Sequence, residues 1–480
     1  MSDCQVRRVA VIGAGISGVL SAGHLIALGI EVTVFERNEA PGGVWVYDER
    51  KPPEPSYPSM KASRADLIGT DREDPEKFLL QHAPPGPCYY NLKNNVPTPL
   101  LEVTLKEWPN DTPDFVKHQV VQQYIEEMSM KAQVHDVTIY GARVRNIGKT
   151  GENWTVSWST LQQNGESKIT ELNDSSCFDA VVVATGHYHA PRIPEIPGLS
   201  ETKKRYGSRI IHSKEYRLPE DFKDKNILLV GGGVSSVDIA NDLSPFAKTI
   251  YQSTRDSHFD LDPIMLPKNG LRVGDVSFVE IHDHDGSLLE NEPLPITIHL
   301  VTGQRLHGIH TIMLCTGYHI TLPFLRQYHS DETSLQDANE TILVTDGTQV
   351  HNLHKDIFYL PDPTLAFVGL PLYTFTFSVF DFQAIVVAQI LSGIVKLPDE
   401  GEMRDEYNKK VEEVGLGKTF HSLQSKEEPY VSDLLSWVNT SRSAQGLAPI
   451  EGFSPKWYAA KEALRQRYRE QIKKPENGAQ

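Results

Sequence analysis

RRVAVIGAGISGVLSAGHLIALGIEVTVFER, at residues 7–37, is the most informative segment of the chain. Residues 8–12 are apolar and rich in β-branched side chains, which is typical of a buried parallel strand. Gly13, Gly15 and Gly18 follow with G-x-G-x-x-G spacing and open a helical pattern. In such a turn the first glycine permits the tight bend and the second lets a pyrophosphate approach the backbone. The third lets the helix pack closely on the strand.

A second predicted strand at residues 31–35 ends in Glu36, where an acidic residue can accept hydrogen bonds from ribose hydroxyls. The start of the helix offers free N–H groups and the positive end of its dipole to phosphates. Strand, turn, helix, strand and acid occur in the required order. The segment therefore predicts a Rossmann-type dinucleotide-binding domain rather than a glycine-rich turn without a ligand.

NILLVGGGVSSVDIANDL, at residues 226–243, repeats this pattern. Residues 226–230 form the predicted strand, and Gly231 and Gly233 begin the turn. Ser236 occupies the third glycine position, which predicts slightly looser packing of helix on strand. The chain therefore contains a second candidate nucleotide site, far from the first in sequence.

The strand after this second turn ends at Ser253, Thr254 and Arg255 instead of in an acidic residue. A carboxylate would repel a 2′-phosphate, whereas Arg255 can pair with it and Thr254 can donate a hydrogen bond. The second nucleotide is therefore predicted to be NADPH, although such an arginine is also often a solvated surface charge. Two dinucleotide sites indicate that electrons pass from a nicotinamide to a second bound cofactor. FAD is the natural choice for the N-terminal site.

Composition and charge exclude several classes of protein. A length of 480 residues predicts two or three domains. There are 47 Lys and Arg against 63 Asp and Glu, and the net charge of −16 argues against a nucleic-acid partner. The chain has no run of about 18 apolar residues that would predict a membrane span. Because the first residues also lack a cleavable signal, we expect a cytoplasmic protein.

The cysteines and histidines do not predict a metal site. The four cysteines lie far apart and form no CxxC pair, which argues against zinc, a redox dithiol or a disulfide framework; they are Cys4, Cys88, Cys177 and Cys315. SFVEIHDHDG, at residues 277–286, resembles a metal cluster, but its alternation predicts a strand entering an Asp285-Gly286 hairpin turn. His282 and His284 would then share one strand face without further ligands, so no metal is expected.

Five further motifs lie between and after the two glycine turns in a defined order. They are GGVW at 42–45, YNLKNNVPTPL at 90–100, VVVATGHYHAPRIPEIPG at 181–198, MLCTGYHITLPFL at 313–325 and FVGLPLYTFTFSVFDFQAIVVAQILSG at 367–393. Together with the glycine turns they resemble the flavin-containing monooxygenases, which are class B flavoprotein monooxygenases. The resemblance spans roughly residues 8–397.

The YNLKNNVPTPL block is similar to the family's L-x-T-N-x-P motif. Leu92, Asn95 and Pro97 are in place, and Asn94 replaces the usual threonine. Asn95 matches the asparagine that family members place over the flavin, near the site of oxygen activation. Asparagine is also common in turns before proline, and the two roles are compatible.

The family's F-x-G-x-x-x-H-x-x-x-Y hallmark aligns with residues 206–216. Tyr206 replaces the phenylalanine and Ser208 the glycine, whereas His212 and Tyr216 keep their spacing. We expect His212 to link the domains rather than to transfer protons.

The resemblance implies one catalytic residue, Asn95, and two sets of cofactor-binding residues. The set implied for FAD is Gly13, Gly15, Ser17, Gly18, Glu36, Arg37, Gly43, Val44, Trp45, Asn95, Val144, Ala184, Thr185, Gly186 and Gln383. The set implied for NADPH is Tyr216, Gly231, Gly233, Ser235, Ser236, Ser253, Thr254 and Arg255.

The fold class implied is α/β, with two nested Rossmann-type dinucleotide-binding domains and a discontinuous FAD domain. The first part of the FAD domain is expected at residues 1–190 and its return part at 321–455. The NADPH domain is expected at 195–320, and residues 456–480 as a charged C-terminal helix and tail. The ATG and CTG segments at the ends of the NADPH domain are the expected hinges.

The implied activity is oxygenation of a nucleophilic nitrogen or sulfur of a small amine or thioether, similar to that of an N,N-dimethylaniline monooxygenase. NADPH would reduce FAD, and O2 would add to give a flavin 4a-hydroperoxide. A Baeyer–Villiger monooxygenase acting on ketones stays open, although its related hallmark ends in tryptophan. An NADPH oxidase or a non-catalytic flavin-binding redox sensor also stays open. The cysteine positions exclude a disulfide reductase, and a homodimer is compatible with the resemblance.

Overall fold

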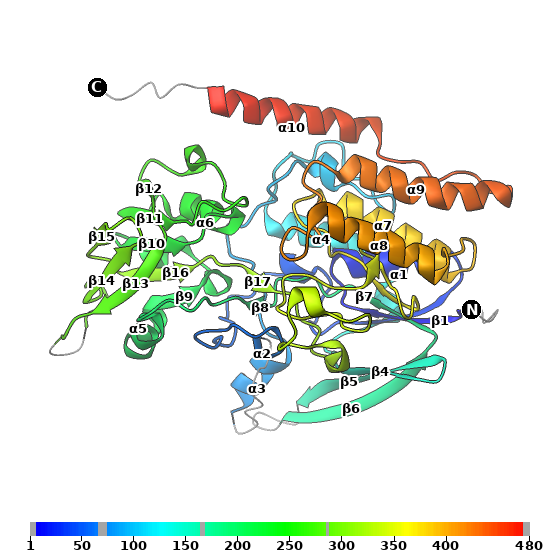
Figure 1. Ribbon diagram of the computed structural model, residues 1–480, viewed down its shortest axis with the longest axis horizontal. Coiled ribbons are helices and arrows are strands. Elements are labelled where there is room, and N and C mark those ends of the chain that lie inside the picture. Colours follow the sequence, from blue (N-terminus) through cyan, green and yellow to red (C-terminus); the bar gives the residue numbers. More distant parts are fainter. Residues whose placement is uncertain (1–5, 66–73, 164–168, 285–287, 474–480) are drawn as a thin grey trace.

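The computed structural model describes residues 6–65, 74–163, 169–284 and 288–473. Within these ranges the chain forms two mainly parallel sheets in separate lobes, with smaller antiparallel sheets beside them (Figure 1). Each parallel sheet contains a strand followed by a glycine turn and a helix. The predicted α/β class with two Rossmann-type units is confirmed.

The larger sheet has the strand order β18-β19-β20-β7-β1-β2-β3. Its strands are β1 Arg8–Ile12, β2 Glu31–Phe35, β3 Thr138–Ile139, β7 Ala180–Val183, β18 Leu353–His354, β19 Phe358–Tyr359 and β20 Leu365–Phe367. The central strands β20, β7, β1, β2 and β3 are parallel. Because β20 pairs with β7, the sheet is completed only by chain that returns from the other lobe.

Helices cover one face of this sheet and an antiparallel sheet covers the other. The helices of this lobe are α1 Ile16–Ala27, α4 His118–Lys131, α7 Thr376–Leu391, α8 Glu400–Val414 and α9 Glu427–Ala444. Helices α1 and α7 pack on each other, and α9 packs on α7 (Figure 1). The antiparallel sheet is β4 Arg143–Thr150, β5 Asn153–Gln163 and β6 Ile169–Phe178. Its buried Trp154 and Phe178 join Phe35 of β2 in a common apolar core.

The smaller parallel sheet has the order β12-β11-β10-β16-β9. Its strands are β9 Ile210–His212, β10 Asn226–Val230, β11 Thr249–Ser253, β12 Gly270–Val273 and β16 Thr311–Leu314. Helices α5 Leu199–Tyr206 and α6 Val234–Leu243 belong to the same lobe. Strands β13 Val276–Ile281, β14 Ile296–Leu300 and β15 Arg305–Leu306 form an antiparallel sheet that shares a core with it.

The strand predicted through the two histidines of the HDHD segment ends earlier, at Ile281. His282 and His284 therefore do not share a strand face, and this prediction was wrong. The His282 ring bonds to the hydroxyl of Thr297 at 2.7 Å, and His284 is exposed. The Asp285-Gly286 turn lies outside the described residues.

Two short strands, β8 Ala190–Pro191 and β17 Tyr318–His319, pair with each other between the lobes (Figure 1). β17 follows the CTG segment directly and β8 follows the ATG segment after three residues, so the chain leaves and re-enters the larger lobe through one antiparallel crossing. The domain boundaries proposed from the sequence stay a prediction.

The remaining helices are α2 Ala62–Ala65, which contacts β8, α3 Pro75–His82 and α10 Pro455–Lys473. Helix α10 contacts the short 3₁₀ turn η2, Thr98–Leu101. Lys456 bonds to Glu102 at 2.7 Å and Arg467 to Asp114 at 2.7 Å. In the part of the chain that the structure describes, no helix combines the length and hydropathy needed to cross a membrane.

The packing of the first turn predicts a stability effect. A Cβ added at Gly18 would lie 1.8 Å from the carbonyl oxygen of Gly13. Gly18→Ala should therefore lower the thermal midpoint by about 1–3 °C, because an overpacked site costs about 1–3 kcal/mol and each kcal/mol is worth about 1 °C in a chain of this size. The matched control is Gly148→Ala, where the nearest neighbour of a Cβ is Asn146 Nδ2 at 3.6 Å. Equal midpoints for the two variants in a melting experiment would contradict the packing argument.

Candidate functional site

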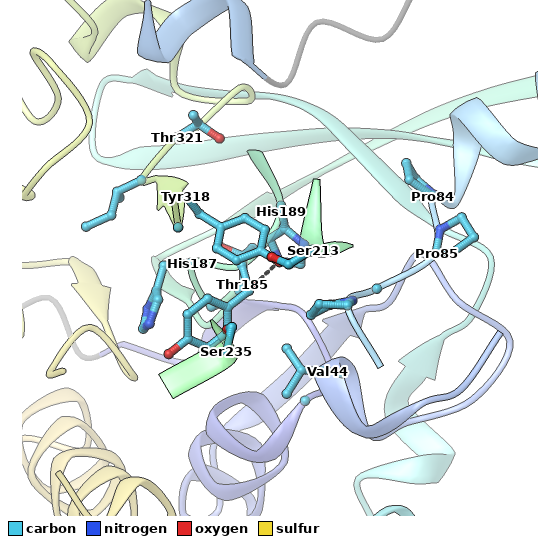
Figure 2. Close-up of a pocket in the computed structure, with 18 of the residues that line it drawn as sticks. Val44, Pro84, Pro85, Thr185, His187, His189, Ser213, Ser235, Tyr318 and Thr321 are labelled. Atoms are coloured by element: carbon cyan, nitrogen blue, oxygen red, sulfur yellow. Dashed lines mark hydrogen bonds between the residues drawn. The ribbon is translucent and has the colours of Figure 1, made fainter. Parts of the chain in front are cut away.

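A cavity of about 1710 Å³ lies between the lobes, and both glycine turns open onto it. Gly13 and Gly15 line it from the larger lobe, and Gly231 and Gly233 from the smaller one. Pockets for one small ligand measure about 300–1,000 Å³, so this volume fits more than one ligand. In Figure 2, side chains from both lobes, such as Val44 and Ser235, border the same space.

The first turn has the geometry that a dinucleotide phosphate requires. Gly13 has a φ of +103°, and a Cβ there would lie 2.8 Å from the carbonyl oxygen of Ala184. Gly15 caps α1 without a side-chain hydrogen bond, and the first turn of the helix contains no acidic residue. The N–H groups at the start of α1 are therefore available to an anion.

Glu36 is held rigidly where β2 ends. Its carboxylate accepts hydrogen bonds from the N–H groups of Ala14 at 2.6 Å and Asn38 at 2.9 Å. Burial raises the pKa of Glu36 above its ordinary value, and these two hydrogen bonds act in the opposite direction. Arg37, the next residue, bonds to the His189 ring at 2.8 Å and also lines the cavity.

The second turn repeats this geometry in the smaller lobe. Gly231 has a φ of +123°, and a Cβ there would lie 2.4 Å from the carbonyl oxygen of Cys315. Gly233 caps α6 with no side-chain bond, and the first turn of α6 has no acidic residue. Ser236 is buried behind the turn, where its hydroxyl accepts a hydrogen bond from Gln252 at 2.8 Å.

Two carboxylates that the sequence pattern did not indicate lie beyond β11. The Thr254 hydroxyl donates to Asp256 at 3.4 Å. Asp260 lies against the middle of the second turn, because a Cβ at Gly232 would be 2.5 Å from its carboxyl carbon. Arg255 is exposed on the cavity wall and forms no ion pair among the described residues.

Asn95 was expected both to stabilise the turn before Pro97 and to face the site. In the structure Asn94 stabilises the turn, and Asn95 faces the cavity. Asn94 is buried and donates to the carbonyl oxygens of Val96 and Asp114, each at 2.7 Å. Its side-chain oxygen accepts from the N–H of Val116 at 2.6 Å. Asn95 is exposed on the cavity wall, and its amide has no hydrogen bond to the residues that the structure describes.

Most residues in the two predicted cofactor sets line the cavity, and four do not. Gly18 and Ser236 lie behind the turns that they support. Tyr216 is buried, and its hydroxyl donates to Asp242 at 2.6 Å. Gln383 accepts from the N–H of Gly369 at 3.0 Å and donates to the Tyr430 hydroxyl at 2.8 Å. Tyr216 and Gln383 therefore lie behind the cavity wall, and their contact with a cofactor stays a prediction.

Tyr216 belongs to a polar network that joins the lobes. Asp242 of α6 accepts from Tyr216 and from the Asn91 amide at 3.1 Å. Asp238, one turn earlier, accepts from the Tyr89 hydroxyl, and burial raises the pKa of Asp238. Residues 89–91 lead into the loop that carries Asn95, so α6 of the smaller lobe holds this segment of the larger lobe. The sequence held no local signal for these pairings.

Two histidines near the crossing have pKa values well below the ordinary value for histidine. His187 faces the cavity (Figure 2), and neither ring nitrogen has a hydrogen bond to the described residues. Burial lowers the pKa of His187 to about 4. The His212 ring contacts the carbonyl oxygen of Gly317 at 3.1 Å and accepts from the N–H of Lys214 at 3.1 Å. Burial lowers the pKa of His212 to about 3.

Comparison with known proteins gives consistent matches along most of the chain. The family model described as flavin-binding monooxygenase-like matches residues 6–57, 103–270 and 297–447. The flavin-containing monooxygenase ustF2 of Aspergillus flavus is 65% identical over 99% of this chain and 100% of its own length. The flavin-containing monooxygenase ustF1 of the same fungus is 44% identical over 97% of this chain and 91% of its own length.

The fold also matches that of a solved enzyme. The structure of S-allyl-L-cysteine S-oxygenase from Allium sativum superimposes with a TM-score of 0.68 at 26% sequence identity. The match covers 98% of this chain and 95% of that one.

The environment of His212 predicts a pH dependence of stability. Its folded pKa lies below the ordinary value of about 6.5, so the unfolded state takes up a proton that the folded state does not. The contribution of His212 to the free energy of unfolding is therefore constant above about pH 6.5. It falls as the pH drops towards 3, by at most about 1.4 kcal/mol per pH unit. His212→Asn preserves an acceptor for Lys214 N–H and should flatten the fall of the thermal midpoint between pH 7 and pH 4.

His284→Asn, at an exposed position, is the matched control for this experiment. It should keep the wild-type profile of midpoint against pH. A wild-type slope in His212→Asn would show that the buried ring does not carry the effect.

Proposed function

We propose, because the chain belongs to the flavin-binding monooxygenase family, that it uses FAD and NADPH to oxygenate a nucleophilic nitrogen or sulfur of a small molecule. One observation carries this proposal: two glycine turns with uncapped helix ends open onto a single cavity, together with the free amide of Asn95. This arrangement supports two dinucleotides placed with their reactive ends towards each other.

The larger lobe fits FAD. The N–H groups at the start of α1 would bind its pyrophosphate, and Glu36 would bind ribose hydroxyls. Trp45 and Val44 border the cavity above the turn, and Trp45 packs edge-on against Phe377 with ring centroids 6.3 Å apart. These apolar side chains would cover the flavin ring.

The smaller lobe fits NADPH. The start of α6 would bind the pyrophosphate, and Ser235 in its first turn lines the cavity. Arg255 at the end of β11 supports a nucleotide with a 2′-phosphate, as the sequence predicts. Asp256 and Asp260 lie nearby, so the preference for NADPH depends on cations that outweigh them.

Bound FAD, reduced by NADPH, would supply the activation of O2. The chain contributes orientation, a hydrogen-bond donor and exclusion of water. The Asn95 amide can donate to an oxygen atom on the cavity side, because Asn94 rather than Asn95 holds the loop. Tyr188 and Tyr318, whose rings lie 5.4 Å apart, narrow the cavity at the crossing and reduce its access to water.

Sulfur is the substrate atom that the comparisons favour. The solved S-allyl-L-cysteine S-oxygenase matches nearly the whole chain. Amine nitrogen is the alternative, and a ketone would indicate Baeyer–Villiger chemistry. The test is to supply the FAD-loaded protein with NADPH, O2 and matched thioether, tertiary amine and cyclic ketone substrates, and to identify products by mass spectrometry. A sulfoxide or an N-oxide supports the proposal, whereas an ester product, or hydrogen peroxide alone, contradicts it.

The role of Asn95 makes a specific prediction. Asn95→Asp keeps the size of the side chain but removes its N–H donor and adds a negative charge. NADPH oxidation should continue while the ratio of product formed to NADPH consumed falls about tenfold or more, with hydrogen peroxide making up the difference. The magnitude follows from the loss of about 10²–10³ in rate when one donor to a developing oxyanion is removed.

The control measurement is the FAD content and the NADPH affinity of this variant, which should match those of the wild type. An unchanged ratio of product to NADPH would show that the Asn95 amide does not protect the oxygenation step.

A further inference from the structure

Three cationic side chains line the cavity without a carboxylate partner. Arg192 follows β8, Arg255 follows β11, and Lys418 lies in the loop between α8 and α9. None of the three forms an ion pair with the residues that the structure describes. They come from segments far apart in sequence, so only the folded chain brings them to one wall.

Ring stacking and strand-like pairing connect the Arg255 segment to the Lys418 loop. Phe259, four residues after Arg255, stacks on Tyr373 with ring centroids 4.7 Å apart and an interplanar angle of 9°. Leu372, beside Tyr373, donates to the carbonyl oxygen of His421 and accepts from the N–H of Leu423, each at 2.9 Å. The chain after β11 and residues 421–423 therefore meet on either side of residues 372–373.

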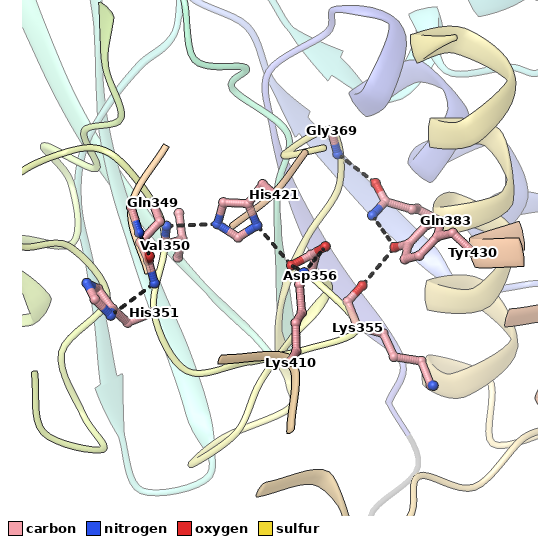
Figure 3. Close-up of polar contacts among 11 residues, drawn as sticks. Gln349, Val350, His351, Lys355, Asp356, Gly369, Gln383, Lys410, His421 and Tyr430 are labelled. Atoms are coloured by element: carbon pink, nitrogen blue, oxygen red, sulfur yellow. Dashed lines mark hydrogen bonds and ion pairs between the residues drawn. The ribbon is translucent and has the colours of Figure 1, made fainter. Parts of the chain in front are cut away.

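A buried polar network fixes the Lys418 loop (Figure 3). The N–H of Gly417 donates to the side-chain oxygen of Gln349 at 2.5 Å. The His421 ring accepts from the N–H of Val350 at 3.0 Å and bonds to Asp356 at 2.8 Å. Lys410 of α8 also bonds to Asp356, at 2.6 Å. Lys418 therefore stands on a loop anchored on both sides, and its position is built into the fold.

The crossing of β8 and β17 fixes the backbone of Arg192. Its N–H donates to the carbonyl oxygen of Gly317 at 2.9 Å, and its carbonyl oxygen accepts from the Thr316 hydroxyl. The Nη1 atom of its guanidinium is buried and has no hydrogen-bond partner among the described residues. A buried donor without a partner is costly, so this nitrogen is suited to an external acceptor.

The three charges influence one another. Partial loss of solvent at the cavity wall and the positive charges of Arg192 and Arg255 lower the pKa of Lys418, an otherwise exposed side chain, to about 8. Burial lowers the pKa of Arg192, and Arg255 contributes to that shift. Asp346 offsets part of this repulsion, but its carboxylate accepts from the N–H and hydroxyl of Thr348. A dianion bound among the three cations would relieve their repulsion.

We propose that Arg192 and Lys418 join Arg255 in binding the 2′-phosphate of NADPH, and this inference rests on the proposed use of that nucleotide. The pyrophosphate belongs at the start of α6, whereas a 2′-phosphate leaves the ribose near the end of β11, where Arg255 lies. A phosphomonoester carries about 1.5 to 2 negative charges at neutral pH and accepts several charge-assisted hydrogen bonds. The larger lobe thus contributes to nucleotide selection in the smaller lobe.

This arrangement explains how NADPH is preferred despite Asp256 and Asp260. Arg255 alone faces two neighbouring carboxylates, which disfavour an added phosphate. Arg192 and Lys418 reach the same wall from outside the smaller lobe and make the balance positive. The preference for NADPH is therefore complete only when both lobes enclose the nucleotide.

The experiment compares adenosine 2′,5′-bisphosphate with adenosine 5′-monophosphate, which differ only in the 2′-phosphate. Their dissociation constants are measured by calorimetry on the FAD-loaded protein, without turnover. Arg192→Ala and Lys418→Ala should each weaken the bisphosphate about tenfold and leave the monophosphate within about twofold, because each removes one charge-assisted contact. Lys426→Ala, at an exposed position farther along the same loop region, should change neither.

Each other outcome is decisive. Equal weakening of both ligands would place the two cations on the 5′-phosphate side and overturn the inference, as would unchanged binding of both. If Arg192→Ala reduces the FAD content, the exposed Lys418 carries the test through Lys418→Ala and a charge-retaining Lys418→Arg, which should restore bisphosphate binding. A wild-type protein that binds both ligands equally would refute the use of NADPH itself, a result distinct from failure of the two variants.

Discussion

The antiparallel crossing of β8 and β17 is the constraint on which the site depends. Only two residues of each strand pair, yet this contact places the glycine turn after β1 and the turn after β10 on opposite sides of one cavity. The ATG and CTG segments that lead into it also press their carbonyl oxygens against Gly13 and Gly231. The crossing therefore sets both the shape of each turn and the distance between them. His212, buried and with a lowered pKa, adds a contact to Gly317 at the same point.

The inter-lobe contacts form a second layer of control around the cavity. Asp238 and Asp242 of α6 hold residues 89–91, and the loop beyond them presents Asn95. The Lys418 loop reaches the cavity because Asp356 and His421 anchor it from within the larger lobe. Each lobe thus contributes residues that position part of the other lobe's cavity wall. Such mutual dependence suits chemistry that must exclude water while two cofactors stay in register.

The sequence predicts the parts of the site that depend on local spacing. Strands β1 and β10, both glycine turns and the strands that follow them lie where the G-x-G-x-x-G patterns place them. Two residues chosen by motif alone, Tyr216 and Gln383, lie behind the cavity wall, bonded to Asp242 and Tyr430. Arg192 and Lys418 carried no signal, because their placement depends on pairings between segments hundreds of residues apart. Residue spacing predicts a local turn. It does not predict that the buried pair Asp356 and His421 anchors the distant loop that carries Lys418.

The position of β20 and α7 in the chain affects how the protein is synthesised. The larger sheet needs β20 beside β7, and α1 is covered by α7, which ends at Leu391. Strands β9, β10, β11, β12 and β16 of the smaller sheet have all emerged by Leu314. At about 5–20 residues per second, the first 183 residues wait on the order of tens of seconds for their missing neighbours. During that interval the nascent chain exposes one edge of β7 and the apolar face of α1, so it is then most open to chaperones and to aggregation.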